Sequence, residues 1–183
     1  MHHEIGHTRA MKLRDMIIED AEKVLNWRNR PEIADVMFTN DVIAWDDHLA
    51  WMSRALADSS ARYWVVEHAD RPVGVASLND INLRHRRCSW AYYIGEPDTP
   101  GPVGLSVEFE VMAIVFDDMG FNRLISEVLA SNQRVVALHE NVGFVKEGVL
   151  REHVVRNDGA HDVVVLSMLA DEWRRRHSRR RRA

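Results

Sequence analysis

The spacing of hydrophobic and polar residues changes several times along the chain, and each change marks an expected element. Alternating runs rich in β-branched and aromatic residues predict strands at residues 11–17, 61–68, 72–83, 88–95 and 123–129. Apolar residues three and four apart predict helices at 19–29, 31–37, 46–57 and 105–119, and an amphipathic turn after Asn132. Two further strands, 145–156 and 160–170, flank Asn157-Asp158-Gly159, which is a strong hairpin signal.

This order of elements predicts an α/β (α+β) protein. We expect a mixed, mostly antiparallel sheet of about seven strands flanked by about four helices. A length of 183 residues suits one domain with a sizeable core. We assign the domain to residues 11–173, and expect a disordered leader at 1–10 and a disordered Arg-rich tail at 174–183.

The composition of the chain indicates the cellular compartment in which the protein is expected. No run approaches the roughly 20 apolar residues that span a bilayer, and the N-terminus lacks the apolar stretch of a secretion signal. The single cysteine, Cys88, excludes an internal disulfide. We therefore expect a cytoplasmic protein in a reducing compartment.

The charge is unevenly distributed. The net charge is −4, yet residues 174–183 hold seven Arg and no acid, so the remainder is more acidic. Such a tail could contact nucleic acid, an acidic partner or a membrane surface. A solvated terminus is the simpler interpretation, and without interleaved aromatics we expect no nucleic-acid binding. The leader histidines lack an acidic or Cys partner at ligand spacing, so no metal is expected; they are His2, His3 and His7.

The segment from Cys88 to Gly148 is the most informative. A strand feeds a Gly/Pro loop and an apolar helix, an arrangement that points backbone N–H groups at an anion. After the next strand, Asn132 opens an amphipathic turn that closes on His139-Glu140-Asn141-Val142-Gly143-Phe144. This combination resembles the acyl-CoA-binding core of the GCN5-related N-acetyltransferases (GNAT), over about residues 11–173. The resemblance implies acetyl-CoA as cosubstrate and a splay between the fourth and fifth strands.

The resemblance also implies where the cofactor lies. The phosphate loop of the family aligns best with residues 101–106, where only Gly104 matches strictly and Pro102 donates no N–H. A helix that begins at the proline would still expose the amides of Val103, Gly104, Leu105 and Ser106. The alternative is a plain connection between strand and helix. The pantetheine arm is expected to lie along the fourth strand, on the backbone of Tyr92, Tyr93, Ile94 and Gly95, with Asn132 nearby.

Acetyl transfer to an amine needs a base, a site for the oxyanion and an acid for the leaving thiolate. Related enzymes place a Tyr at the position of His139, and a His can donate the same proton. Glu127 lies on the fifth strand, where the amino-sugar branch of the family has its proposed base. The alternatives are a surface His139 and an outward-facing, solvated Glu127. Backbone N–H groups of the splayed strand would hold the oxyanion.

The first half contains LNWRN at 25–29, DVMFTN at 35–40 and WDDHLAWM at 45–52. These segments resemble the acceptor half of one branch of the family, which N-acetylates a UDP-linked 4-amino-4,6-dideoxy sugar on the route to pseudaminic acid for flagellin glycosylation. The implied acceptor residues are Arg28, Met37, Phe38, His48, Trp51 and Tyr92. An Arg fork suits a diphosphate, aromatic and Met side chains suit uracil and a methyl group, and His48 could bond the sugar. Alternatively Met37, Leu49 and Trp51 are core, and Arg28 pairs with Asp35.

We therefore expect a direct, acetyl-CoA-dependent N-acetyltransferase of a UDP-amino sugar. Cys88 has no assigned His or acid and is a poor nucleophile candidate. Two rivals stay open: an N-terminal acetyltransferase of the ribosomal-protein type, and a non-catalytic acyl-CoA-binding module that docks through its tail. An exposed edge strand could support a homodimer, although no feature demands one.

Overall fold

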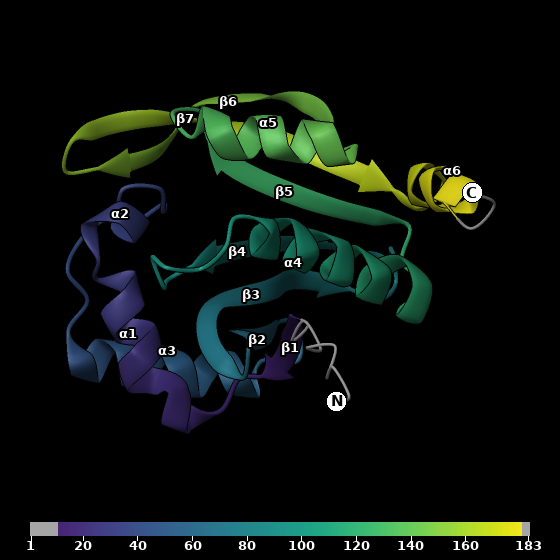
Figure 1. Ribbon diagram of the computed structural model, residues 1–183. Helices are drawn as coiled ribbons and strands as arrows, with labels where there is room; N and C mark the ends of the chain where they lie inside the picture. The colour runs from purple at the N-terminus through teal and green to yellow at the C-terminus, as the bar shows by residue number, and fades with distance from the viewer. Residues whose placement is uncertain (1–10, 181–183) are drawn as a thin grey trace, which may run out of the picture.

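The computed structural model describes the backbone of residues 11–180 and the side chains of 11–176. A seven-stranded sheet has the order β1-β2-β3-β4-β5-β7-β6, as Figure 1 shows. All neighbours are antiparallel except β4 and β5. The strands are β1 (Lys12–Asp15), β2 (Arg62–His68), β3 (Arg71–Asn82), β4 (Arg87–Ile94), β5 (Arg123–Leu129), β6 (Val145–Arg156) and β7 (Gly159–Leu169).

Six α-helices lie within the described residues, where the sequence predicted about four. They are α1 (Ala21–Arg28), α2 (Pro31–Ala34), α3 (Trp45–Ala57), α4 (Pro102–Ala113), α5 (Gln133–Val142) and α6 (Ala170–Arg180). A 3-10 turn (Ile18–Asp20) precedes α1, and a π-helical turn (Ile114–Asp118) continues α4.

Helix α6 extends into the expected tail. It continues to Arg180, through most of the segment predicted to be disordered, because it begins by burying Trp173 in the main core. The Trp173 indole N–H also donates to Asp117 at 3.0 Å. Residues 1–10 and 181–183, which include the predicted leader and the three leader histidines, lie outside the described residues.

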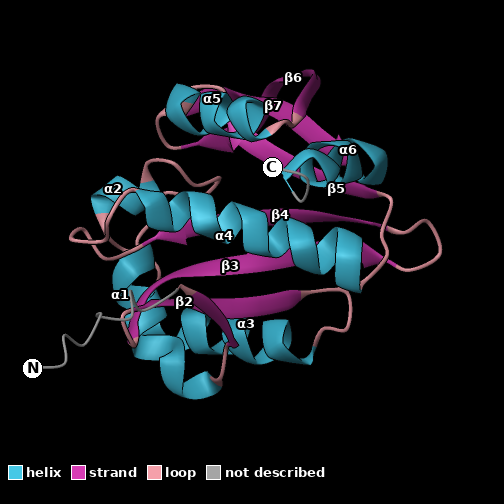
Figure 2. Cartoon of the chain, turned by 45° about the vertical axis from the view of Figure 1, so that its right-hand side comes forward, coloured by secondary structure: helices cyan, strands magenta, loops and turns pink. Residues whose placement is uncertain are grey.

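The helices cover the two faces of the sheet separately (Figure 2). On one face, α1 and α3 pack over Val65 and Val75, with Trp27 and Met52 buried between. On the other face, α4, α5 and α6 cover a larger core that includes Trp64, just one position before Val65. This period-two division follows from side chains pointing alternately to opposite faces of a strand. The sheet therefore separates an N-terminal helical layer from a C-terminal one.

The sheet opens between its two central strands. Parallel pairing of β4 with β5 runs from Arg87↔Arg123 to Trp90↔Ser126 and stops there. Beyond that pair β4 remains paired with β3 as far as Ile94, and β5 remains paired with β7 as far as Leu129. The predicted splay is thus confirmed, and its vertex is the Trp90–Ser126 pair.

Gly95, at the end of β4, is a close packing point between the two layers. A Cβ there would lie 2.2 Å from Cγ of Trp27. We expect Gly95→Ala to lower the free energy of unfolding by about 1–3 kcal/mol, because the indole must move within a packed core. Denaturant unfolding measures this. Gly148→Ala is the matched control, since nothing lies within 4 Å of its Cβ position, and an equal loss in both variants would contradict the packing argument.

Candidate active site

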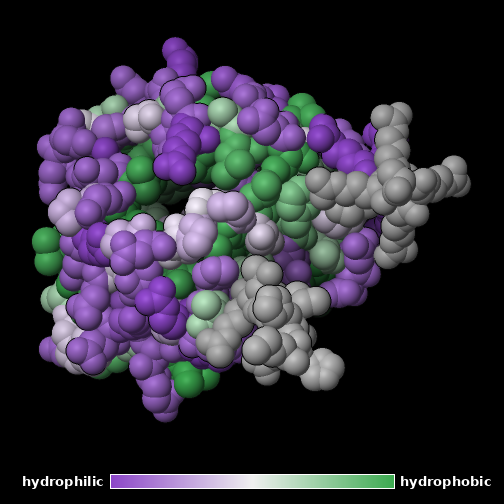
Figure 3. Space-filling model, in the orientation of Figure 1, coloured by the Kyte–Doolittle hydropathy of each residue, from purple (hydrophilic) through white to green (hydrophobic). Residues whose placement is uncertain are grey.

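A cavity of about 940 Å³ occupies the splay and is lined from both faces of the sheet. From the N-terminal layer come residues of α1, α2, the following loop and α3; from the other side come the start of α4 and one face of α5. In Figure 3, apolar side chains gather along the hollow between the two halves of the molecule. The cavity therefore joins the predicted cofactor side to the predicted acceptor side through the sheet.

Helix α4 begins at Pro102, three residues before the predicted start at 105, at a proline that suits a first helical position. The first turn offers fewer free amides than expected, however. The Val103 amide already donates to the Pro100 carbonyl at 3.0 Å, and the Ser106 amide falls within reach of the Pro102 carbonyl by helix geometry. By the same geometry the Leu105 amide faces the carbonyl of the N-cap Gly101, so among the four predicted donors the amide of Gly104 is the one left for an anion.

The absence of a side chain at Gly104 lets a ligand in the cavity approach the backbone of α4 closely. Gly104 lines the cavity, and a Cβ at this position would lie 3.2 Å from the hydroxyl oxygen of Tyr92. Tyr92, Tyr93 and Ile94 line it too, on the unpaired stretch of β4. Their free backbone edge therefore fits an extended, amide-bearing ligand arm.

Gly95 does not belong to this group, contrary to the prediction. It is buried beneath Trp27 and is absent from the cavity lining. Its amide donates to the Val73 carbonyl at 2.8 Å, and its carbonyl accepts from Arg30 at 3.0 Å. Its backbone groups are thus used within the fold.

Asn132 caps α5 and also lines the cavity. Its Oδ1 accepts from the Val135 amide at 3.4 Å, which satisfies one N–H of the first turn. At the other end Gly143 adopts a positive φ of 115°, and the chain turns so that Phe144 returns to the core. The segment that resembled the family is therefore a helix capped at both ends, and it fixes the position of His139.

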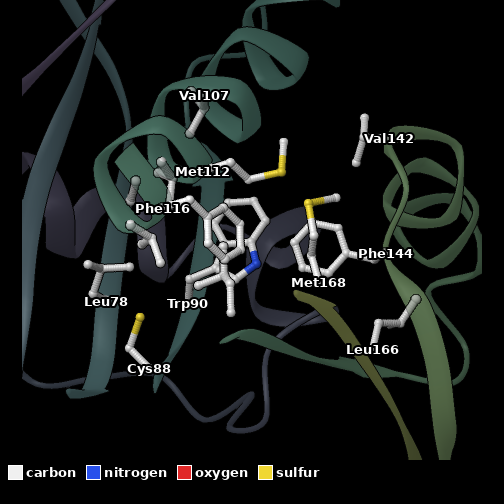
Figure 4. Close-up of a cluster of buried hydrophobic side chains, with 14 of the residues drawn as sticks. Leu78, Cys88, Trp90, Val107, Met112, Phe116, Val142, Phe144, Leu166 and Met168 are labelled. Atoms are coloured by element: carbon white, nitrogen blue, oxygen red, sulfur yellow. The ribbon is translucent and has the colours of Figure 1, made fainter. Parts of the chain in front are cut away.

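His139 is not a surface residue: only 2 % of it is exposed. Its ring packs against Trp90 and Phe144, with centroids 5.3 and 5.2 Å away, and those two rings also contact each other at 6.0 Å. Figure 4 shows Trp90 and Phe144 side by side within this buried cluster. His139 nevertheless belongs to the cavity lining. The interpretation as a solvated helix residue is therefore wrong.

Glu127 is exposed and lines the cavity. It directly follows Ser126, so the two side chains point to opposite faces of β5. Ser126 is buried and bonds the ring of His139, on the side of α5. Two adjacent residues at the vertex of the splay thus place a carboxylate on one face and a hydroxyl on the other.

Arg28 reaches the cavity from the end of α1. Its Nη2 donates to the Thr39 hydroxyl at 3.3 Å, while Nη1 is buried and has no hydrogen-bond partner within the described residues. The predicted alternative partner Asp35 forms no ion pair with it among the described contacts. Burial lowers the pKa of Arg28, with an opposite contribution from Tyr93, and burial raises the pKa of Tyr93.

The apolar acceptor residues Met37, Phe38 and Trp51 all line the cavity. Phe38 and Trp51 are 37 % and 36 % exposed, so they are not core residues. His48 is the exception among the predicted acceptor residues. It is 2 % exposed, stacks under Trp51 at 5.4 Å and does not line the cavity, because its side of α3 faces α1. Burial lowers its pKa, with a smaller contribution from Arg28 in the same direction.

Arg156 ties the acceptor loop to the β6–β7 hairpin, which the sequence did not predict. Its Nη1 donates to the backbone carbonyls of Asp35 and Met37 at 3.0 and 3.2 Å. In Figure 1 the hairpin tip lies beside the loop after α2. Only 7 % of the Arg156 side chain is exposed, so the contact is well shielded from water.

We expect Arg156→Ala to raise KM for the acceptor about tenfold while KM for acetyl-CoA stays constant. The reason is that the loop carrying Met37 loses two hydrogen bonds, each worth about 1 kcal/mol. Steady-state kinetics with each substrate varied separately measures this. Arg151→Ala, an exposed position on the same strand, is the control. An equal rise in both Michaelis constants would contradict a role confined to the acceptor loop.

Two buried site residues escaped the sequence analysis. Glu108 interrupts the apolar stripe of α4, and Ser126 alternates with Leu124 and Val128 on the buried face of β5. The signal in the sequence was a polar residue at a position where the hydrophobic periodicity of the helix or strand predicts an apolar one. What each of them contacts depends on segments that are distant in sequence.

Within the described residues, Cys88 is the remaining candidate nucleophile from the sequence. Cys88 is fully buried, and burial raises the pKa of its thiol to about 12, which makes it a poor nucleophile as expected. Within residues 11–176 no three His, Cys, Asp or Glu side chains are grouped as metal ligands. Among the described helices, none has the length and apolar character needed to cross a membrane.

The structure has two parallel central strands that part at Trp90 and Ser126, a helix that begins beside the opening, and a capped α5. A comparison with protein families agrees with these features. Residues 11–145 match the family described as an acetyltransferase (GNAT) domain. The chain belongs to the GNAT acetyltransferase family. It is an acyltransferase with acetyl-CoA as cosubstrate, and the free amide of Gly104 on α4 and the unpaired edge of β4 fit that ligand.

Individual GNAT relatives differ in their acceptors. Acetyltransferase PseH of Campylobacter jejuni is 26 % identical over 126 residues, which are 69 % of this chain and 77 % of PseH. The putative ribosomal N-acetyltransferase YdaF of Bacillus subtilis is 22 % identical, covering 90 % of this chain and 87 % of YdaF. A structure of spermidine N-acetyltransferase from Vibrio cholerae with CoA and spermine has a TM-score of 0.83 at 23 % identity, covering 89 % and 97 % of the two chains.

Proposed function

We propose that this acetyltransferase transfers the acetyl group of acetyl-CoA to the 4-amino group of a UDP-linked 4-amino-4,6-dideoxy sugar. The specific acceptor is UDP-4-amino-4,6-dideoxy-N-acetyl-β-L-altrosamine, on the route to pseudaminic acid and flagellin glycosylation. The similarity to PseH supports this assignment, and so does the chemistry of the cavity wall on the acceptor side.

The observation that carries the proposal is a set of unsatisfied polar atoms. Nη1 of Arg28, the hydroxyl of Tyr93 and the hydroxyl of Thr99 are buried without hydrogen-bond partners among the described residues, and all three residues line the cavity. Buried polar groups normally have partners, so a ligand with acceptor atoms is the expected one. A guanidinium attracts a diphosphate and repels a polyamine, which favours an anionic acceptor over spermidine.

The apolar part of the acceptor has matching contacts. Phe38 and Trp51 present exposed aromatic faces to the cavity, which suit stacking by uracil. Met37 is half-buried beside them and suits a methyl group such as that at C6 of the sugar. These three residues and Arg28 together describe a nucleotide-sugar site.

The reaction is a direct transfer across the sheet. Glu127, exposed on the acceptor side, takes the proton of the ammonium group. The amine nitrogen then attacks the thioester carbon, and backbone N–H groups of β4 hold the oxyanion. As this intermediate collapses to the amide, the nitrogen loses its second proton to solvent on the open acceptor side. His139, on the cofactor side, supplies the proton that the leaving sulfur receives. The acid and base work from opposite faces, so the two protons do not compete for one group.

A thiol-release assay tests the proposal. Purified protein is given acetyl-CoA with the UDP-4-amino sugar, with basic N-terminal peptides, with spermidine or with unlinked amino sugars. Release with the UDP-sugar alone is the expected result. Release with peptides alone would assign the protein to the ribosomal type, and release with spermidine alone to the polyamine type. Binding of acetyl-CoA with no release on any amine would favour a non-catalytic acyl-CoA-binding module.

A further inference from the structure

A fully buried carboxyl group lies behind the cavity, and the reaction described above does not use it. Glu108 on α4 has no exposed surface. Its Oε1 accepts from the Tyr92 hydroxyl at 3.2 Å and lies at ion-pair distance, 3.2 Å, from Nδ1 of His139, while Oε2 and Nδ1 both have no hydrogen-bond partner among the described residues. An ionised carboxylate in such a place is costly unless a cation lies beside it. The group in position to be that cation is the ring of His139.

The other nitrogen of the same ring contacts Ser126. The Ser126 Oγ lies 3.0 Å from Nε2 of His139, and both residues are buried. His139, Trp90 and Phe144 form a buried cluster of three rings with centroids 5.2 to 6.0 Å apart, which restricts the His139 ring while its Nε2 faces this hydroxyl. A proton that leaves the ring through Nε2 therefore passes to Ser126 first.

Ser126 lies where the two strands part. It forms the last parallel pair with Trp90, and both residues line the cavity. A thioester that extends from the side of α4 and α5 to an amine beside Glu127 must pass this vertex. The Ser126 hydroxyl is thus better placed to meet the sulfur than the ring behind it.

We propose that Glu108, His139 and Ser126 form a proton relay that ends at the sulfur atom of acetyl-CoA. The proposal rests on the acetyl transfer proposed above. In the loaded state the ring is an imidazolium paired with the Glu108 carboxylate, and its Nε2–H donates to Ser126. As the carbon–sulfur bond breaks, the sulfur takes the hydroxyl proton of Ser126, and Ser126 takes the proton from Nε2.

One proton is thereby moved from His139 to CoA, which leaves as the thiol. The ring becomes neutral and keeps its hydrogen on Nδ1, facing Glu108. Solvent returns one proton to the ring after CoA has left. Ser126 is the catalytic residue at the sulfur, and Glu108 is a positioning residue that fixes which nitrogen carries the remaining hydrogen. Tyr92 holds the carboxylate in place.

The test measures kcat in mixtures of H₂O and D₂O. If two protons move in the rate-limiting step, a plot of the wild-type kcat against the deuterium fraction of the solvent should be curved. The same plot for Ser126→Ala should be a straight line. Ser126→Ala, His139→Gln and Glu108→Gln should each lower kcat about ten- to a hundredfold, with KM for acetyl-CoA unchanged. Because the residues act as a unit, the Ser126/His139 double variant should be no slower than the slower single variant.

A straight line for the wild type would overturn the relay, and this measurement needs no variant to fold. Full additivity of the two single losses would overturn it as well, as would an unchanged rate in Ser126→Ala. Thermal unfolding and acetyl-CoA binding check the folding of each variant. The assay uses any amine that the wild type acetylates, or slow hydrolysis of acetyl-CoA if there is none, so failure of the UDP-sugar assignment is seen separately.

Discussion

Glu127→Gln should lower kcat by a hundredfold or more, with KM for acetyl-CoA unchanged. The amide has the same shape as the carboxylate but cannot accept the proton of the ammonium group, and a lost general base typically reduces the rate by about 10²–10⁴. Glu127 is exposed to the cavity and its carboxylate forms no ion pair among the described contacts, so the substitution leaves no buried partner unsatisfied. Steady-state kinetics with saturating acetyl-CoA provides the measurement.

A second readout separates base catalysis from simple contact with the substrate. Without the base, only the fraction of acceptor that is already a free amine reacts. The rate of the variant should therefore rise about tenfold per pH unit until the amine itself titrates, while the wild-type rate rises less steeply. Glu110→Gln, exposed on α4 and outside the cavity, is the matched control. A variant within threefold of the wild type would remove Glu127 from the mechanism.

Arg28→Gln should raise KM for the nucleotide sugar about a hundredfold. A hydrogen bond to a charged group contributes about 1.5–3 kcal/mol, and each 1.4 kcal/mol is a factor of ten in affinity. The loss should be confined to acceptors that carry phosphate, because Arg28 reaches the cavity from α1 in the N-terminal layer, whereas the predicted cofactor amides are on α4. Kinetics with the UDP-sugar and with the same amino sugar lacking UDP makes this comparison.

The same substitution should leave the protein at least as stable as before. The guanidinium has one buried nitrogen without a partner, and a buried, incompletely paired charge destabilises the folded state in the absence of ligand. The melting temperature of Arg28→Gln without ligand should equal or exceed that of the wild type. Arg54→Gln, exposed on α3, is the control. An equal loss of activity with both acceptors would show that Arg28 supports the fold and does not bind the phosphate groups.

The local elements could be predicted from the sequence because local physics specifies them. Pro102 at the start of α4, Asn132 as the cap of α5 and the Asn157–Asp158 turn act through their own backbone preferences. The tail has a polar composition, but α6 continues into it as far as Arg180 from a start that buries Ala170 and Trp173 in the core. A tertiary contact outweighed composition there.

The site was only partly predictable, for a geometric reason. Residues on the free edge of β4 and on the face of β5 could be placed by period and family resemblance, and Tyr92 and Glu127 do line the cavity. Gly95 and His48 could not, because their environment is set by Trp27 and by the contact between α3 and α1. The identity of an amino acid does not reveal which distant residue will pack beside it.

By itself, the sequence determined the order of the strands and of the helices before α6, the family resemblance and the cap of α5 at Asn132, since these depend on residues close together in the chain. Only the tertiary structure decided that the β4–β5 pairing ends at Trp90 and Ser126. It also brought Glu108, Ser126 and His139 together from α4, β5 and α5. Contacts between distant segments arise from packing of the whole core, which no local pattern encodes.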